Sequence, residues 1–289
     1  MRTLRQVKDL INNMARENHI NPQILSRNYM LERLLERISL SEYKDKFILK
    51  GGMLIADLVG VDMRATVDMD TTIKYYPVSN DSIEKAFDSI LSVELDDNVD
   101  IQIKSVKDIR SEGGYAGFRV SLDALMETAI VPIKVDITTG DEITPKEVEY
   151  SYDLMLENRS IEILSYNIES VLAEKLETII SRGAANTRMR DFYDVYILLK
   201  VKGQNIEEKT LAKAIAATAK QRGSFSLLPE GKLILEEVFS SNLLVGYWTR
   251  YQKEYIYAED IAWDEIKEGV ISIWNPLVDR ILYINENSD

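Results

Sequence analysis

The spacing of apolar residues changes near residue 166, and this change limits the folds that the chain can adopt. From residue 47 to about residue 165 the apolar residues alternate or form short runs, which is typical of β-strands. From residue 168 onward they recur every three or four positions, as in packed helices. With 289 residues and 45% hydrophobic content, the chain can bury two cores. We therefore predict two domains, residues 1–166 and residues 167–289.

Helices are also predicted inside the first domain. Residues 3–16 and 22–40 have helical spacing, and Asn21 is the expected cap of the second helix. Shorter helices are expected after Gly52 and over about residues 80–93, between predicted strands. The first domain is therefore predicted to be of the α/β (α+β) class, a mixed sheet with helices, and the second domain to be helical.

Composition excludes several classes of chemistry. The chain has no cysteine, so it has no disulfides, no thiolate nucleophile and no cysteine zinc site. Its single histidine, His19, follows a predicted helix end, which leaves no multi-histidine metal site and no Ser-His-Asp triad. The net charge of −13 argues against broad nonspecific binding of nucleic acid. Any polyanionic substrate would therefore have to meet a local positive patch.

The start of the chain interleaves charged and apolar residues, unlike a secretory leader. No later apolar run approaches the roughly 18 residues that a membrane span needs. We therefore expect a cytoplasmic protein with no membrane contact.

Two aspartates, Asp68 and Asp70, stand one residue apart in a predicted strand. Side chains at positions i and i+2 of a strand share a face, so two like charges are held close together. A shared proton, a basic side chain or a divalent cation must offset their repulsion. Mg²⁺ suits two carboxylates that share it with a substrate phosphate. An isolated D-x-D is more often part of a solvent-facing strand. The interpretation as a metal site therefore needs supporting features elsewhere in the sequence.

Two features that support a metal and phosphate site lie within the same domain. Asp136 is the one acid in the apolar stretch VPIKVDIT, which fits a third carboxylate and a base for an acceptor hydroxyl, or a strand that turns an acid outward. Gly51 and Gly52 separate a predicted strand from a helix, where the backbone N–H groups of Gly52 and Met53 can approach a phosphate. An ordinary tight turn is the alternative for the glycine pair.

A third supporting feature lies in the predicted helical domain. Lys175 is flanked by apolar positions of a predicted helix. Arg182, Arg188 and Arg190 then fall within nine residues that contain no acid. This local cationic cluster suits phosphate binding, although a solvated loop between helices would have the same composition.

Five stretches taken together resemble the AbiEii/AbiGii toxin family, and the order of elements resembles the DNA polymerase β superfamily of nucleotidyltransferases. The stretches are LKGGMLIADL, MRATVDMDTTIK, IKVDIT, LAEKLETIISR and RMRDFYDVYIL. They cover most of residues 45–200. Members of the toxin family are nucleotidyltransferase-like toxins of abortive-infection, type IV toxin-antitoxin systems.

The resemblance carries over to particular residues. It implies that Gly51 and Gly52 form the nucleotide-binding glycine motif and that Asp68 and Asp70 bind the metal. Lys175 matches the lysine of the family's A-E-K-L motif.

Two further acids match the family's motifs, and one residue differs from the residue that related enzymes carry. Asp191 and Asp194 match the acids of its R-D-x-x-D motif. Because residues three apart share a helix face, Asp191 could orient Lys175 or an arginine, and Asp194 is the second candidate. Related enzymes commonly carry Ser or Thr where this chain has Met53, so a hydroxyl contact with the triphosphate is missing here.

The implied activity is Mg²⁺-dependent transfer of a nucleotide from a nucleoside triphosphate, with GTP or a pyrimidine triphosphate as the donor. The resemblance implies the 3′ end of tRNA as the acceptor, a block of growth as the result and a role in antiviral defence. It also implies an antitoxin encoded nearby that need not contact the enzyme. The lysines of the stretch KTLAKAIAATAKQRG could track RNA phosphates, or form a solvated helix face. A kinase-like phosphotransferase and a nucleotide-binding regulator without catalysis remain the alternatives, the second motivated by Met53.

Overall fold

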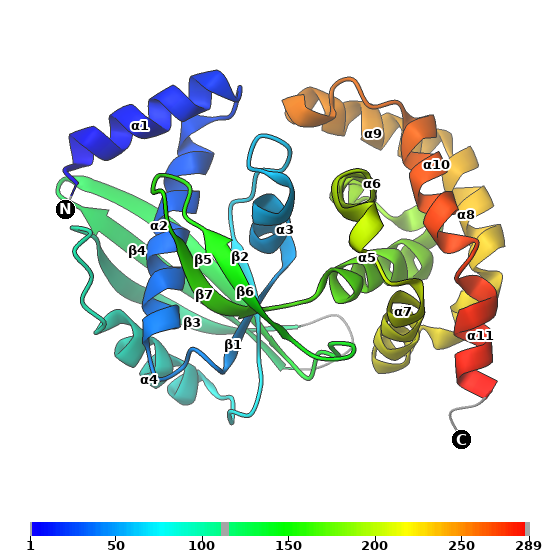
Figure 1. Cartoon of the computed structure of the whole chain (residues 1–289), viewed down its shortest axis with the longest axis horizontal. Coiled ribbons are helices and arrows are strands. Elements are labelled where there is room, and N and C mark those ends of the chain that lie inside the picture. The colour runs from blue at the N-terminus through cyan, green and yellow to red at the C-terminus, as the bar shows by residue number, and fades with distance from the viewer. Residues whose placement is uncertain (1, 111–115, 287–289) are drawn as a thin grey trace. The chain divides into compact units, whose positions relative to one another are not determined.

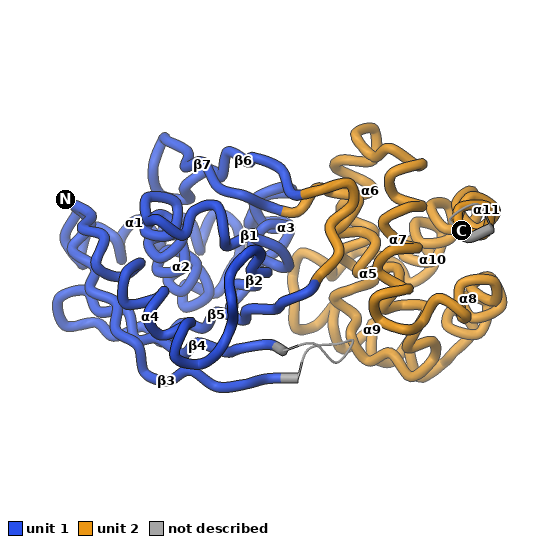
Figure 2. The backbone as a smooth tube through the Cα atoms, turned by 90° about the horizontal axis from the view of Figure 1, so that it is seen from below, with its two compact units in different colours: residues 1–140, 147–165 blue, residues 141–146, 166–289 orange. Residues whose placement is uncertain are grey.

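The computed structural model describes residues 2–110 and 116–286 (Figure 1). The chain divides into two compact units, which Figure 2 colours separately. Unit 1 comprises residues 1–140 and 147–165, and unit 2 comprises residues 141–146 and 166–289. The predicted domain boundary, between residues 166 and 167, lies one residue after the division between residues 165 and 166. That the two units are separate domains stays a prediction.

Unit 1 is built on a seven-stranded sheet with the strand order β3-β4-β5-β2-β1-β7-β6. The strands are β1 (Phe47–Lys50), β2 (Met69–Ile73), β3 (Asp100–Arg110), β4 (Ala116–Met126), β5 (Ala129–Thr139), β6 (Val148–Asp153) and β7 (Ser160–Ser165). The pairs β2–β5 and β1–β7 are parallel, and the other neighbours are antiparallel. The predicted mixed sheet is therefore confirmed.

The sequence patterns did not reveal β6. It is an edge strand in which only Tyr152 is buried, so it lacks the alternation that indicates a half-buried strand. It is held by antiparallel pairing with β7. Pairing with a distant strand, and not local pattern, therefore defines this element.

The helices of unit 1 follow local signals. They are α1 (Leu4–Glu17), α2 (Pro22–Leu40), α3 (Gly51–Val59) and α4 (Asn80–Leu91). Asn21 caps α2 by accepting the Gln23 N–H at 2.8 Å, and Ser79 caps α4 by accepting the Ser82 N–H at 3.1 Å. Helix α2 packs against β5 and β7, and α4 packs against β3.

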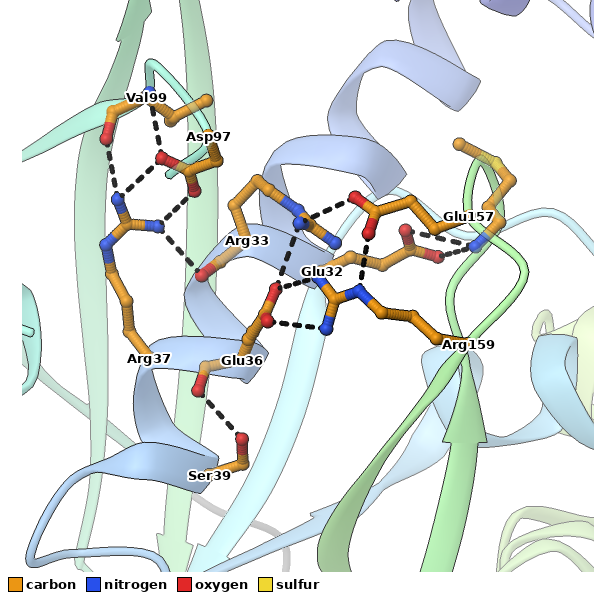
Figure 3. Close-up of polar contacts among 10 residues, drawn as sticks. Glu32, Arg33, Glu36, Arg37, Ser39, Asp97, Val99, Glu157 and Arg159 are labelled. Atoms are coloured by element: carbon orange, nitrogen blue, oxygen red, sulfur yellow. Dashed lines mark hydrogen bonds and ion pairs between the residues drawn. The ribbon is translucent and has the colours of Figure 1, made fainter. Parts of the chain in front are cut away.

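Helix α2 also carries charged residues that are buried against the rest of unit 1 (Figure 3). Arg37 donates to both carboxylate oxygens of Asp97, at 2.7 and 3.1 Å. Arg159, in the turn between β6 and β7, donates to both oxygens of Glu36 at 2.7 and 3.0 Å. Glu32 accepts a backbone N–H from the same turn. These contacts fix α2 to two loops that are distant in sequence.

Unit 2 is helical, as predicted. Its helices are α5 (Ile168–Arg182), α6 (Met189–Lys202), α7 (Glu208–Arg222), α8 (Gly231–Ser240), α9 (Asn242–Glu254), α10 (Trp263–Trp274) and α11 (Val278–Glu286). Helix α5 packs against both α6 and α7. Trp248 and Trp274 are buried, so these aromatic residues belong to the core. No helix within the described ranges is both long enough and apolar enough to cross a membrane.

Candidate functional site

Four charged residues form a row across four neighbouring strands of unit 1. In the strand register, Arg119 on β4 pairs with Asp136 on β5, and Asp136 pairs with Asp70 on β2. Asp70 in turn pairs with Lys50 on β1. Paired residues of adjacent strands project from the same face, so the charges run plus, minus, minus, plus. The fold therefore brings Asp70 and Asp136 side by side.

Asp68 lies outside the strand in which the D-x-D pattern placed it. Strand β2 begins at Met69, and Asp68 occupies a bend one residue earlier. The hydroxyl of Thr66 donates to the backbone carbonyl of Asp68 at 3.2 Å, which supports this bend. Pairing of β2 with β1 stops at Asp70, because β1 ends at Lys50 where α3 begins. Only Asp70 is thus held by the β-ladder.

Gly51, the first residue of the glycine pair, lies directly against Asp70. Gly51 has φ +65°, and a Cβ atom built on it would lie 2.2 Å from Asp70 Oδ2. Helix α3 begins at Gly51, so the N–H groups of its first turn have no acceptor within the helix. A helix start favours negative charge. The turn expected to bind phosphate and the acid expected to bind a metal are therefore adjacent, and both roles stay predictions.

Two residues beside Gly52 were not recognised from the sequence. A Cβ atom on Gly52 would lie 2.6 Å from Thr66 Oγ1 and 3.0 Å from the Arg64 guanidinium. Arg64 is 1% exposed, and its guanidinium donates to the carbonyl of Ala65. The sequence signal was a basic residue four positions before Asp68. Arg64 and Thr66 thus form the wall against which the glycine turn packs.

The side chain of Met53 points into the core, where it is 1% exposed. A side-chain contact between Met53 and a triphosphate is therefore absent from this arrangement, and only its backbone N–H in the first turn of α3 remains for a phosphate.

Arg119 is a further residue that the sequence analysis missed. Its Nε donates to Asp136 Oδ1 at 2.7 Å, and its Nη2 donates to Asp136 Oδ2 at 2.6 Å. These hydrogen bonds are the main cause of a raised pKa for Arg119, and the charges of Asp68 and Asp70 add to it. Arg119 is therefore a counter-ion of Asp68, Asp70 and Asp136, which together form the acidic cluster. Its outward position in the strand sequence GFRVSLDAL was the available signal.

Two acids of this cluster are candidates for holding a magnesium ion. Asp68 and Asp70 are half-buried carboxylates, and two hard oxygen donors completed by substrate phosphate are the usual protein contribution to Mg²⁺. Among the described residues no group of three acidic, histidine or cysteine side chains is arranged to hold a metal. Asp136 is instead bound by Arg119. Asp68 and Asp70 would hold the ion.

Unit 2 gathers three of the predicted residues. Lys175 on α5 places its Nζ 2.8 Å from Asp191 Oδ1 and 2.9 Å from Asp194 Oδ2, both on α6. Asp194 is completely buried, and the Lys175 side chain is 17% exposed. Asp191 was expected to orient Lys175 or an arginine; the structure brings it to Lys175, and its role stays a prediction. Asp194, the second candidate in the sequence analysis, makes an equally short contact between two helices.

The three arginines of unit 2 have separate surroundings. Arg182 is exposed at the end of α5. The Arg188 Nε lies 3.9 Å from Asp191 Oδ2, and Arg190 donates to the Tyr255 hydroxyl at 3.1 Å. The Arg190 guanidinium also lies over the Tyr255 ring, 5.7 Å from its centroid. Of the three, Arg188 is the one that this geometry places beside Asp191.

Three basic residues of the stretch KTLAKAIAATAKQRG on α7 are exposed, and a fourth is held by an ion pair. Lys209, Lys213 and Lys220 are exposed, as the phosphate-tracking interpretation requires. Arg222 instead donates to Glu177 at 2.6 Å and has a side chain that is only 13% exposed. Arg222 therefore does not belong to an open basic face.

The sequence matches the family described as nucleotidyl transferase AbiEii toxin, type IV toxin-antitoxin system, over residues 33–269. This chain belongs to the AbiEii family. The resemblance found from its motifs is thereby confirmed, and the AbiEii protein is a nucleotidyltransferase of the toxin class. A search of curated proteins finds no match to this sequence.

Two solved structures share the fold of this AbiEii protein. MenT4, a nucleotidyltransferase toxin from Mycobacterium tuberculosis, has 14% sequence identity and a TM-score of 0.57. The match covers 93% of this chain and 98% of MenT4. JHP933 from Helicobacter pylori has 17% identity and a TM-score of 0.52, with 93% and 99% of the two chains covered. At these identities the likeness concerns the fold alone.

Proposed function

We propose that this AbiEii protein transfers a nucleoside monophosphate from a nucleoside triphosphate to an acceptor hydroxyl, with Asp68 and Asp70 as the ligands of Mg²⁺. The observation that carries the proposal is the contact between Gly51 and Asp70. It puts a turn suited to phosphate against an acid suited to a metal. A tight turn without function would not require an acid at this point.

In the proposed reaction the acceptor oxygen forms a bond to the α-phosphorus while the bond between that phosphorus and the bridging oxygen breaks. Pyrophosphate leaves, and the hydroxyl proton passes to a base. Bound Mg²⁺ would neutralise charge on the phosphates and on the leaving group. Asp136 is the proposed base, because it lies next to Asp70 in the sheet register. Loss of turnover in Asp136→Asn with metal binding kept would support that role.

Lys175 is proposed to supply a positive charge to the triphosphate, with Asp191 and Asp194 fixing its position. Their contacts of 2.8 and 2.9 Å leave Lys175 a single orientation, which suits a residue that acts as a point charge. Arg182, Arg188 and Arg190 are proposed as further phosphate contacts. Asp191→Asn should then weaken nucleotide transfer while the chain stays folded.

We propose the 3′ end of tRNA as the acceptor and GTP as the first donor to test. The exposed lysines of α7 support an RNA acceptor, whereas the net charge of −13 argues against indiscriminate RNA binding. The family implies an antitoxin as the genetic partner, and we propose that the protein acts in the cytoplasm in defence against phage.

The test incubates the purified protein with Mg²⁺, each of four labelled triphosphates in turn, and total tRNA. Asp68→Asn and Asp70→Asn should abolish transfer of label to RNA. Asp123→Asn is the matched control, because this acid lies on β4 in an exposed ion pair with Lys104 and should leave transfer unchanged. Triphosphate binding without transfer to RNA, protein or a small acceptor would contradict the proposal and favour a regulator.

A further inference from the structure

The contact between Arg119 and Asp136 occupies both oxygens of one carboxylate in the acidic cluster. The two hydrogen bonds, of 2.7 and 2.6 Å, have the parallel bidentate form in which a guanidinium binds a carboxylate most strongly. The two residues are also paired in the β4–β5 register, so the backbone sets them opposite each other. The register of the sheet therefore places these two side chains next to each other.

The location of Arg119 sets it apart from a structural arginine. Its side chain is 44% exposed, whereas Arg37 in the buried pair of α2 is 5% exposed. An exposed ion pair contributes little to stability, because water solvates both partners when they separate. Opening this contact therefore costs less free energy than opening a buried pair, although its bidentate form makes it stronger than an ordinary exposed pair. A buried pair such as that of Arg37 could not open in this way.

The charges around Asp136 show what would make Arg119 leave. Asp70 is its neighbour on one side and Arg119 is its neighbour on the other. A divalent cation held by Asp68 and Asp70 would lie close to the guanidinium and repel it. In the absence of such an ion, the guanidinium offsets the repulsion among the carboxylates. A metal ion and Arg119 thus stabilise the same group of acids.

We propose that Arg119 is an internal counter-cation that competes with the divalent metal for the carboxylates of the acidic cluster. Asp136 becomes available, as a metal ligand or as a proton acceptor, only when Arg119 releases it. This inference rests on the proposed function, because it assumes that Asp68 and Asp70 bind a metal. Arg119 is accordingly a positioning residue, which acts on the reaction through Asp136.

The experiment measures binding of Mn²⁺ alone, by the loss of its free electron paramagnetic resonance signal, so that no turnover is needed. Arg119→Gln removes both the charge and the bidentate contact, and Arg119→Lys keeps the charge without the fork. Lys134→Gln is the matched control, because Lys134 is exposed on β5, two residues before Asp136 and on the same face. Thermal unfolding of each variant shows that it is folded.

We expect Arg119→Gln to bind Mn²⁺ about tenfold more tightly than the wild type, a change of about 1.4 kcal/mol. Arg119→Lys should lie between the two, and Lys134→Gln should stay within about twofold of the wild type. Adding Asp136→Asn to Arg119→Gln should cancel most of the gain, because Asp136 is the group that Arg119 releases.

Three results would overturn the inference, and they can be distinguished from one another. If the wild type binds Mn²⁺ and Asp70→Asn does not, but Arg119→Gln is unchanged or weaker, Arg119 does not compete with the metal and the proposed function stands. If Lys134→Gln increases the Mn²⁺ affinity as much as Arg119→Gln does, the effect comes from the loss of a positive charge in general. The same holds if the increase in affinity persists when Asp136→Asn is added to Arg119→Gln. If no variant binds Mn²⁺ and the wild type does not either, the metal site of the proposed function fails together with the inference.

Discussion

The carboxylate of Asp70 fills the space that a side chain on Gly51 would occupy. A Cβ atom at Gly51 would lie 2.2 Å from Asp70 Oδ2 and 2.8 Å from Asp70 Cβ. Since real Cβ atoms do not approach other atoms so closely, either residue must move if the glycine is replaced. The turn that begins α3 and the acid on β2 therefore depend on each other for their positions.

We expect Gly51→Ala to lose metal binding and nucleotide transfer by at least about tenfold, because Asp70 must move away from its place beside the turn. The backbone adds a cost of about 1–2 kcal/mol, since φ +65° is unfavourable for alanine. Urea unfolding and Mn²⁺ binding measure the two effects. Gly246→Ala, in α9 with nothing within 4 Å of its Cβ, should raise stability by up to about 1 kcal/mol. Normal Mn²⁺ binding by Gly51→Ala would contradict this account of the turn.

Lys175→Met should destabilise the protein by about 3 kcal/mol, because it removes a cation 2.9 Å from the completely buried carboxylate of Asp194. Adding Asp194→Asn should restore more than half of the loss, since the neutral amide no longer needs that charge. Urea unfolding of the two single variants and the double variant provides the test. Additive losses in the double variant would show that the two side chains are not coupled.

Stability should fall as the pH rises from about 4.5 to 8, because of Glu32. Burial raises the pKa of Glu32 to about 8, against an ordinary value of 4.5. In this interval the unfolded chain releases the Glu32 proton while the folded protein keeps it, so a higher pH favours unfolding. The loss from this residue is at most about 5 kcal/mol.

Glu32→Gln should flatten that dependence, since glutamine is neutral at every pH and its oxygen can still accept the Met155 N–H. The measurement is the urea midpoint at several pH values between 4.5 and 8. Glu84→Gln, an exposed substitution on α4, should keep the wild-type slope. An unchanged slope in Glu32→Gln would rule out this residue as the source.

Asp97→Asn should destabilise the protein by about 3 kcal/mol, whereas Asp123→Asn should change stability by less than about 1 kcal/mol. The side chains of Arg37 and Asp97 are 5% and 6% exposed, so the substitution leaves a buried guanidinium without its charged partner. Lys104 and Asp123 are 65% and 29% exposed, and water replaces their contact. Equal effects of these two substitutions in urea unfolding would contradict the importance of burial.

Sequence reasoning succeeded where the signal was local. The apolar spacing identified the sheet-containing part and the helical part, and Asn21 marked the start of α2. The motif residues Gly51, Asp70 and Asp136 were also recognised, because a glycine pair or an acid interrupts an apolar stretch. These features are properties of a few neighbouring residues, and the sequence displays them directly.

Sequence reasoning failed where strand pairing and close packing decide the outcome. It placed Asp68 in the strand, but β2 begins one residue later, at Met69, where its pairing with β5 starts. It gave no role to Arg64, which packs against Gly52 from a loop before β2.

By itself, the sequence determined the family of this protein and the class of its fold, and it named the acids that are proposed to bind a metal. Only the tertiary structure decided which charges face those acids. Arg119 binds Asp136 because β4 and β5 pair in one particular register, and a shift by one residue would turn Arg119 to the opposite face. The periodicity within each strand does not specify that register, because the register is fixed by the two-residue turn between Met126 and Ala129 that joins the paired strands.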